Sequence, residues 1–146
     1  MKMQALTRCL RAIGLATPVA TILAFGTWAD EISTFKAGAH RLSAPEIMKL
    51  MIGNTLGGKS KSGDEWFEYY DPNGTARGIS AADGKYSGEW WLDGDKFCTK
   101  YPSFNWQECD IVLFNPSANK VLLLKPDGSS TSGTAPQVIV GDPQGL

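Results

Sequence analysis

Hydrophobic and polar positions follow two different periods in this chain. The earlier one is helical: Ile47, Leu50 and Met51 recur at the spacing of one helix face, which predicts a short amphipathic helix. Ser43 and Glu46 have the spacing of a capping box, with a proline in the first turn, and a Gly-Asn pair ends the run. One face of this helix is expected to be buried.

From Thr55 onward the pattern changes to short segments rich in aromatic and β-branched residues, separated by Gly, Pro, Asn and Asp. Such a pattern is typical of antiparallel strands joined by hairpins. The expected strands are 54–58, 65–70, 75–80, 85–92, 96–101, 108–114, 119–125 and 129–133, with a further candidate at 137–140.

Three tight turns support this division. Asp71-Pro-Asn-Gly74 and Lys125-Pro-Asp-Gly128 place proline where φ is fixed and glycine where φ is positive. Asp93-Gly94, between two aromatic segments, favours the turn whose twist matches a two-stranded hairpin.

The strand order predicts the fold class. Sequential strands without crossover helices either close into a barrel or split into a sandwich, and closure removes exposed edges. We therefore predict an all-β fold with one short N-terminal helix, in which an antiparallel meander forms a small up-and-down, calycin-like barrel of about eight strands. The sandwich stays open as an alternative, and the helix could plug one end of the barrel or pack outside it.

Strand parity predicts which side chains face the interior. Alternate residues of a strand share a face, so a short loop after Asp93 places the following residues together on the inside: Tyr86, Gly88, Trp90, Leu92, Phe97, Thr99 and Tyr101. The aromatic members, Tyr86, Trp90, Phe97 and Tyr101, are the candidate ligand-binding residues. Trp91 lies on the opposite, mostly polar face.

The N-terminal region has the layout of a secretory signal. Lys2, Arg8 and Arg11 precede an uncharged stretch, and the first acidic residue is Asp30. The apolar part is too short for a transmembrane helix, which needs about 20 residues. We expect cleavage after Ala29, so that residues 1–29 form a signal peptide, 30–42 an irregular lead-in, and 43–146 a single β-rich domain without a stable membrane span.

Charge and cysteines fit export to the periplasm or the medium. Removing 29 of the 146 residues removes three of the 14 basic residues and none of the 15 acidic ones, which leaves a net charge of −4. This balance disfavours nucleic acid as a partner. Cys98 and Cys109 remain, and in an oxidising compartment we expect them to form a disulfide; a metal site would lack further ligands nearby.

Residues capable of catalysis are few. Glu65, Glu68, Asp71 and Glu89 lie among aromatic residues, and paired carboxylates of this kind act in glycoside hydrolysis. Ordinary strands with aromatic residues inside and acids outside explain the pattern better. His40 is the single histidine, so no histidine pair can hold a metal. We assign no catalytic residue, metal or cofactor.

Several short motifs together carry a resemblance to a known family. They are Leu42-Ser-Ala-Pro-Glu-Ile, Gly53-Asn-Thr-Leu, Tyr69-Tyr-Asp-Pro-Asn-Gly74, Gly88-Glu-Trp90 and Phe97-Cys98 with Cys109. Through them the chain, over about residues 42 to 130, resembles a family of small exported alphaproteobacterial proteins catalogued as a domain of unknown function. The resemblance implies a compact β-domain and an exported location, without an established reaction.

Two functional hypotheses follow. The first is a non-catalytic binding domain that holds a small apolar or glycan ligand inside the barrel. The second is a protein-interaction module, such as an inhibitor of an envelope hydrolase, with Trp91 and Trp106 as anchors in a partner's cleft.

Overall fold

The computed structural model describes residues 33, 35–130 and 134–146. The predicted signal peptide, residues 1–29, therefore lies outside the described residues. Within the described ranges, no helix has the length and apolar character needed to cross a membrane.

The elements whose bounds are fully described are one short α-helix, one 3₁₀ turn and nine strands, and residues 33 and 35–37 are also helical. The helix α2 spans Ala44–Met51, and a 3₁₀ turn, η1, spans Pro102–Phe104. The strands are β1 (His40–Arg41), β2 (Asn54–Lys59), β3 (Glu65–Tyr70), β4 (Thr75–Ser80), β5 (Gly84–Asp93), β6 (Lys96–Tyr101), β7 (Trp106–Asn115), β8 (Lys120–Leu124) and β9 (Gln137–Val140).

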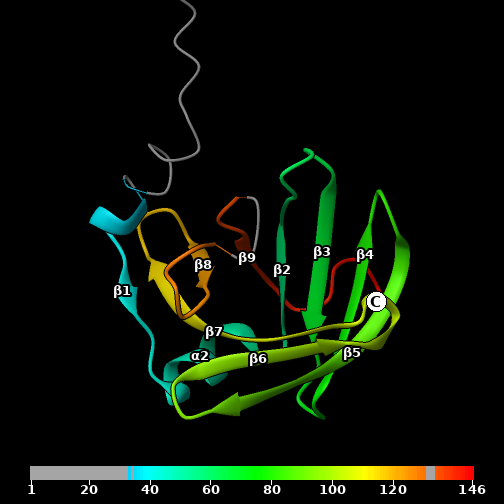
Figure 1. Ribbon diagram of the computed structural model, residues 1–146, viewed down its shortest axis with the longest axis horizontal. Helices are drawn as coiled ribbons and strands as arrows, with labels where there is room; N and C mark the ends of the chain where they lie inside the picture. The colour runs from blue at the N-terminus through cyan, green and yellow to red at the C-terminus, as the bar shows by residue number, and fades with distance from the viewer. Residues whose placement is uncertain (1–32, 34, 131–133) are drawn as a thin grey trace, which may run out of the picture.

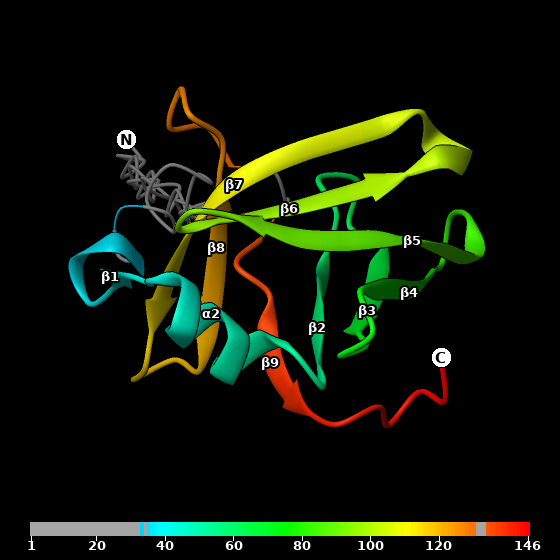
Figure 2. The same cartoon turned by 90° about the horizontal axis from the view of Figure 1, so that it is seen from below.

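Strands β2 to β9 form a closed antiparallel barrel, as the sequence predicted. Each of β2 to β8 pairs with the next strand in the chain, and β9 closes the ring by pairing with both β8 and β2. In Figure 1, β2, β3 and β4 run across the direction of β5, β6 and β7, and Figure 2 shows the same barrel from below. Strand β1 pairs with β7 outside the ring.

One predicted strand lies mostly outside the described residues. The segment 129–133 was expected to be a strand, but Ser130 makes only an isolated bridge to Leu124, and residues 131–133 lie outside the described ranges. The run Ser-Ser-Thr-Ser-Gly contains no apolar side chain that could be buried against the barrel. The eighth strand of the barrel is instead β9, the segment at 137–140.

The lead-in is more ordered than its sequence suggested. It contributes strand β1, and the side chains of Phe35 and Leu42 are buried. Phe35 packs on the outside of the barrel in an apolar cluster with Leu122 and Leu124, while Leu42 belongs to the main core. The segment 35–42 is therefore not irregular, and although most of its residues are exposed, Phe35 and Leu42 are not.

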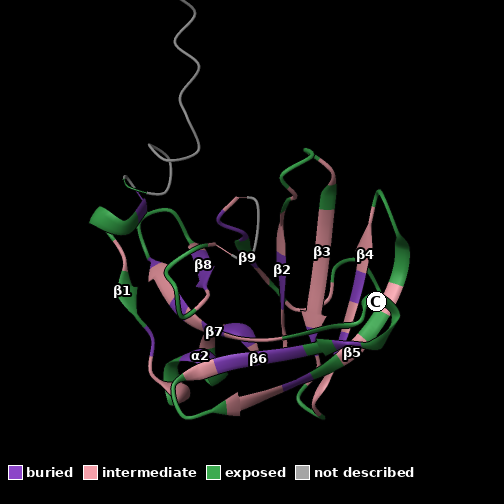
Figure 3. Ribbon diagram, in the orientation of Figure 1, coloured by how far each residue is buried: buried purple, intermediate pink, exposed green. Residues whose placement is uncertain are grey.

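The predicted inward face of β5 and β6 is confirmed. Trp90 and Phe97 are buried side by side, with ring centroids 6.0 Å apart and planes inclined by 24°. Figure 3 shows the buried residues of β6 as a nearly continuous stretch. On this strand Cys98 is buried as well, although its side chain points to the other face.

Helix α2 closes one end of the barrel. Ile47 and Met51 are completely buried, and they belong to the same core cluster as the inward-facing residues Tyr70, Phe97 and Val112. A helix packed on the outer surface of the sheet could not reach these side chains. The backbone NH of Ala44 also donates to Asp95 Oδ1 at 2.8 Å, which joins the start of the helix to the β5–β6 turn.

The predicted disulfide is present. Cys98 and Cys109 face each other across β6 and β7, with their Cα atoms 3.9 Å apart and a sulfur–sulfur bond of 1.97 Å. The bond ties the two strands together on the outer face of the barrel.

Candidate functional site

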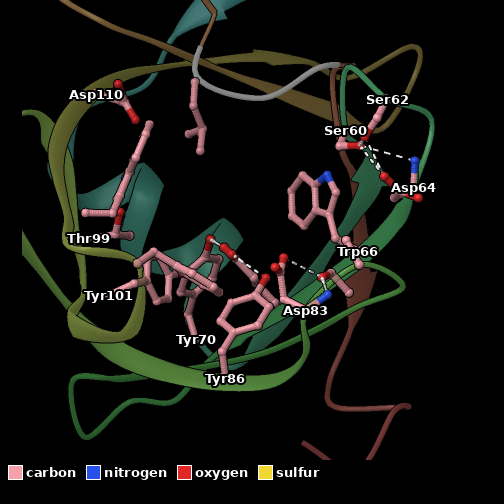
Figure 4. Close-up of a pocket in the computed structure, with 16 residues that line it drawn as sticks. Ser60, Ser62, Asp64, Trp66, Tyr70, Asp83, Tyr86, Thr99, Tyr101 and Asp110 are labelled. Atoms are coloured by element: carbon pink, nitrogen blue, oxygen red, sulfur yellow. Dashed lines mark hydrogen bonds between the residues drawn. The ribbon is translucent and has the colours of Figure 1, made fainter.

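The half of the barrel away from α2 contains a cavity of about 410 Å³. This volume lies within the range of about 300–1,000 Å³ that is typical of small-molecule sites. Figure 4 shows the side chains that surround the cavity. They are Ser60, Ser62, Asp64, Trp66, Glu68, Tyr70, Ser80, Ala82, Asp83, Tyr86, Thr99, Tyr101, Phe104, Trp106, Asp110 and Leu123.

A carboxylate with two tyrosine donors lies at the centre of the lining. Tyr70 Oη donates to Glu68 Oε2 at 2.6 Å, and Tyr86 Oη donates to Glu68 Oε1 at 2.8 Å. Both carboxylate oxygens are thereby held in place. Tyr101 Oη is buried nearby and has no hydrogen-bond partner among the described residues.

Local sequence explains why these groups converge. Trp66, Glu68 and Tyr70 alternate along β3, so all three point to the inside. Tyr86 lies opposite Gly78 in the β4–β5 ladder, and a Cβ at Gly78 would come within 2.3 Å of the Tyr86 ring. The absence of a side chain at Gly78 is therefore what allows the Tyr86 ring to lie flat over β4 and reach Glu68.

The environment raises the pKa of all three tyrosine hydroxyls. Burial is the largest cause for Tyr70, Tyr86 and Tyr101, and the negative charge of Glu68 raises each pKa further. The three hydroxyls therefore keep their protons in the pH range where tyrosine normally titrates. Tyr70 and Tyr86 act as fixed hydrogen-bond donors to Glu68.

Two hairpin loops add polar groups at the mouth. In the β2–β3 loop, Ser60 and Ser62 both hydrogen-bond to the carboxylate of Asp64. In the β4–β5 loop, Ser80 Oγ donates to Asp83 Oδ2 at 2.9 Å. The sequence analysis assigned no role in binding to either loop.

The remaining walls combine aromatic rings with polar groups. In Figure 4 the indole of Trp66 points into the cavity from β3, while Thr99 and Asp110 occupy the opposite wall. Phe104 and Trp106, in and after η1, contribute rings at the rim, and their exposed fractions are 43% and 37%.

The four predicted ligand-binding residues divide into two pairs. Tyr86 and Tyr101 line the cavity, and their rings are in edge contact at a centroid distance of 5.5 Å. Trp90 and Phe97 lie deeper in the core, toward α2, and do not line the cavity. Parity placed all four correctly on the inside, but it could not show where along the axis the helix fills the barrel.

The two predicted partner-binding residues also differ. Trp106 is exposed at the cavity rim, where Lys125 Nζ lies 5.1 Å from its ring centroid. Trp91 is half-buried on the outer face, opposite Cys98 in the β5–β6 ladder. The structure therefore brings only Trp106 to the cavity.

Only one member of the acidic cluster considered for glycoside hydrolysis lines the cavity. This residue is Glu68. Glu65 lies 4.0 Å from Lys59 on the surface, and Asp71 forms an ion pair with Arg77 at 3.1 Å. A signal for Glu68 was present in the sequence, because it is the one acid of this cluster that has an aromatic residue both two positions before it, Trp66, and two positions after it, Tyr70.

The described residues contain no cluster of three or more potential metal ligands of the kind His, Cys, Asp and Glu. Comparison with known proteins adds no relative: no family model, curated protein or solved structure matches the chain. The fold and the cavity define the chain as a small β-barrel domain with an internal site, and the family resemblance of the sequence motifs stays a prediction.

Proposed function

We propose that this protein is an exported, non-catalytic binding domain that holds a small ligand in the open half of its barrel. The observation that carries the proposal is the cavity of about 410 Å³, which is bounded by aromatic rings and contains a preorganised carboxylate. Concave sites with apolar walls and a few fixed polar groups are the usual form of small-molecule sites.

The composition of the walls favours a ligand that has both an apolar face and polar groups. Trp66, Tyr86 and Phe104 supply flat apolar surface, whereas Glu68 and the loop carboxylates supply hydrogen-bond acceptors. A wholly apolar ligand would exclude water from carboxylates whose acceptor capacity is only partly used by the tyrosine and serine hydroxyls, and burying a charged acceptor in this way costs more than the about 1–3 kcal/mol of a neutral group. A glycan or another polar ligand fits better.

The hydrogen bonds of Glu68 support binding rather than acid–base chemistry. Both oxygens accept from tyrosine hydroxyls whose pKa is raised by burial. Such donors fix the carboxylate in orientation, and they are poor proton carriers near neutral pH.

Tryptophan fluorescence tests the proposal directly. Trp66 lines the cavity, whereas Trp91 does not. Titration of the mature protein with envelope oligosaccharides and lipids should change the emission in a saturable way. The change should be much smaller in Trp66→Phe, where Trp106 is the remaining tryptophan of the lining, and fully retained in the control Trp91→Phe. If no compound in the panel changes the emission, or if Trp66→Phe responds like the native protein, the binding function is wrong.

A second candidate function is interaction with an envelope protein, such as inhibition of a hydrolase. The exposed rings of Phe104 and Trp106 at the rim favour it, because aromatic side chains are common anchors of protein interfaces. Capture from envelope extract with native protein, Trp106→Ala and Trp91→Ala separates the two ideas. A partner retained by Trp91→Ala and lost by Trp106→Ala supports this function; identical capture by all three contradicts the rim as an interface.

A further inference from the structure

The charged groups that line the cavity all have the same sign. Four carboxyl side chains contribute, those of Asp64, Glu68, Asp83 and Asp110. Among the described residues of the lining, none is lysine, arginine or histidine. The field inside the cavity is therefore that of an anionic site, and clefts lined by one sign of charge concentrate ligands of the opposite sign.

The aromatic rings reinforce this preference. Six of the lining residues are aromatic, namely Trp66, Tyr70, Tyr86, Tyr101, Phe104 and Trp106. The face of an aromatic ring attracts cations, most strongly where water is excluded. Aromatic cages with nearby carboxylates are a general solution for binding substituted ammonium groups.

A buried hydroxyl with incomplete hydrogen bonding lies beside the carboxylate. Tyr101 is 5% exposed and lines the cavity, and its Oη makes no hydrogen bond of standard geometry to a described residue, although it is near enough to Glu68 and Tyr70 for both to affect its pKa. A buried hydroxyl without a partner is unfavourable. Its oxygen can accept an N–H bond from an ammonium group, or contact the methyl groups of a quaternary one.

At the rim of the cavity, a lysine of the chain already lies between an aromatic ring and a carboxylate. Lys125 Nζ lies 5.1 Å from the ring centroid of Trp106 and 3.1 Å from Glu108 Oε1. A ring face and a carboxylate thus hold an ammonium group at the edge of the cavity. The interior offers the same two elements around Glu68, without a basic side chain among the lining residues to occupy them.

From these observations we propose that the ligand is a small organic cation, whose positively charged nitrogen lies between Glu68 and the rings of Tyr86, Tyr101 and Trp66. The proposal rests on the binding function given above and specifies its ligand class. A quaternary ammonium compound and a protonated amine share the required chemistry, and the experiment distinguishes them.

Pairs of charged and neutral ligands test whether the positive charge of the ligand contributes to binding. Binding to the mature protein is measured by calorimetry for choline and for dimethylbutanol, in which carbon replaces the quaternary nitrogen, and for glucosamine and N-acetylglucosamine. At least one charged member should bind about tenfold or more tightly than its neutral counterpart. Binding of choline indicates a quaternary ligand, and binding of glucosamine alone indicates a primary amine.

Substitutions of single carboxylates test which acidic residue of the protein binds the ligand cation. Glu68→Gln should lower the affinity for the charged ligand about tenfold and leave the neutral ligand unchanged. Glu65→Gln, a carboxyl removed from the outer face of the same strand, should change neither. Because Glu68→Gln disturbs the tyrosine network, Asp83→Asn in the exposed β4–β5 loop serves as a second variant, and it should weaken only the charged ligand.

The outcomes distinguish failure of the cationic ligand class from failure of the binding function itself. If the neutral members bind as tightly as the charged ones, the cationic ligand is wrong and the binding function stands. If none of the four binds but an envelope oligosaccharide or lipid changes the Trp66 emission, the cationic ligand is again wrong and the function stands. If neither experiment detects a ligand, both are wrong.

Discussion

The ring of Tyr101 lies directly against Gly88 on the inner wall of the barrel. A Cβ at Gly88 would come within 2.5 Å of Tyr101 Cδ1 and within 2.3 Å of the backbone oxygen of Lys100. Contacts this short with backbone cannot be relieved by a rotamer change. Gly88 therefore determines how close β5 and β6 approach and where the Tyr101 ring is placed.

Replacement of Gly88 by alanine should destabilise the protein. Gly88→Ala is expected to lower the free energy of unfolding by about 1–3 kcal/mol, because overpacking displaces both the ring and the backbone. Urea denaturation measures the change. Ser87→Ala, at the exposed neighbouring position, is the control and should remain within about 0.5 kcal/mol of the native protein. Equal stability of the two variants would contradict the close packing.

High pH should unfold the protein through its tyrosines. The pKa values of Tyr70, Tyr86 and Tyr101 are raised in the folded state above the usual tyrosine value of 10.0, chiefly by burial. Below pH about 10 both states are protonated and the stability is fully present; above it the unfolded state loses protons first, so stability falls as pH rises. The slope is up to about 1.4 kcal/mol per pH unit for each buried tyrosine.

Tyrosinate absorbance and circular dichroism, followed together, check this expectation. Ionisation of these tyrosines should coincide with the loss of structure, and Tyr101→Phe should make the alkaline fall in stability less steep. If all four tyrosines of the sequence ionise reversibly while the protein keeps its native circular dichroism, the burial of Tyr70, Tyr86 and Tyr101 is wrong.

Loss of the disulfide should reduce stability without abolishing the fold. The bond closes a loop of sequence separation 11 between adjacent strands. In the chain-entropy model such a loop contributes about 2–3 kcal/mol. Urea denaturation of Cys98→Ala/Cys109→Ala should show a fall of this size, and reduction of the native protein should reproduce it. If the urea midpoint is unchanged after complete reduction, the disulfide contributes nothing measurable and the backbone hydrogen bonds between β6 and β7 are sufficient to hold the two strands together.

The helical plug makes a large and local contribution to stability. Ile47 is completely buried at the end of the barrel, whereas Met48 on the same helix is 43% exposed. Ile47→Ala should cost about 2–5 kcal/mol because it leaves a cavity in the core. Met48→Ala should have an effect within about 0.5 kcal/mol. Thermal denaturation of both variants provides the comparison, and a similar shift for the two would place the helix outside the core.

Export predicts a defined mature form. Expression of the full chain in a bacterium should give a periplasmic or secreted product that begins at Asp30, because cleavage after Ala29 removes the basic and apolar N-terminal region. Intact-mass measurement of the fractionated protein identifies the new N-terminus. Recovery of the uncut chain in the cytoplasm, with free thiols at Cys98 and Cys109, would contradict the expected compartment.

The sequence by itself determined the strands, the turns and the inward face of the barrel. Alternation along β5 and β6 was sufficient to place Trp90 and Phe97 together, since a strand has two faces and only one of them was apolar. The β6–β7 disulfide also followed from the two remaining cysteines and their short separation.

Only the tertiary structure decided which part of the interior is filled and which is open. Strand periodicity carries no information about position along the barrel axis, so Trp90 and Tyr86 looked equivalent until α2 was seen to fill one end. The charge of the cavity was hidden for the same reason: Glu68, Asp83 and Asp110 come from separate segments of the chain and meet only when the barrel closes. Local patterns report which way a side chain points, whereas the chemistry of a site depends on which side chains meet.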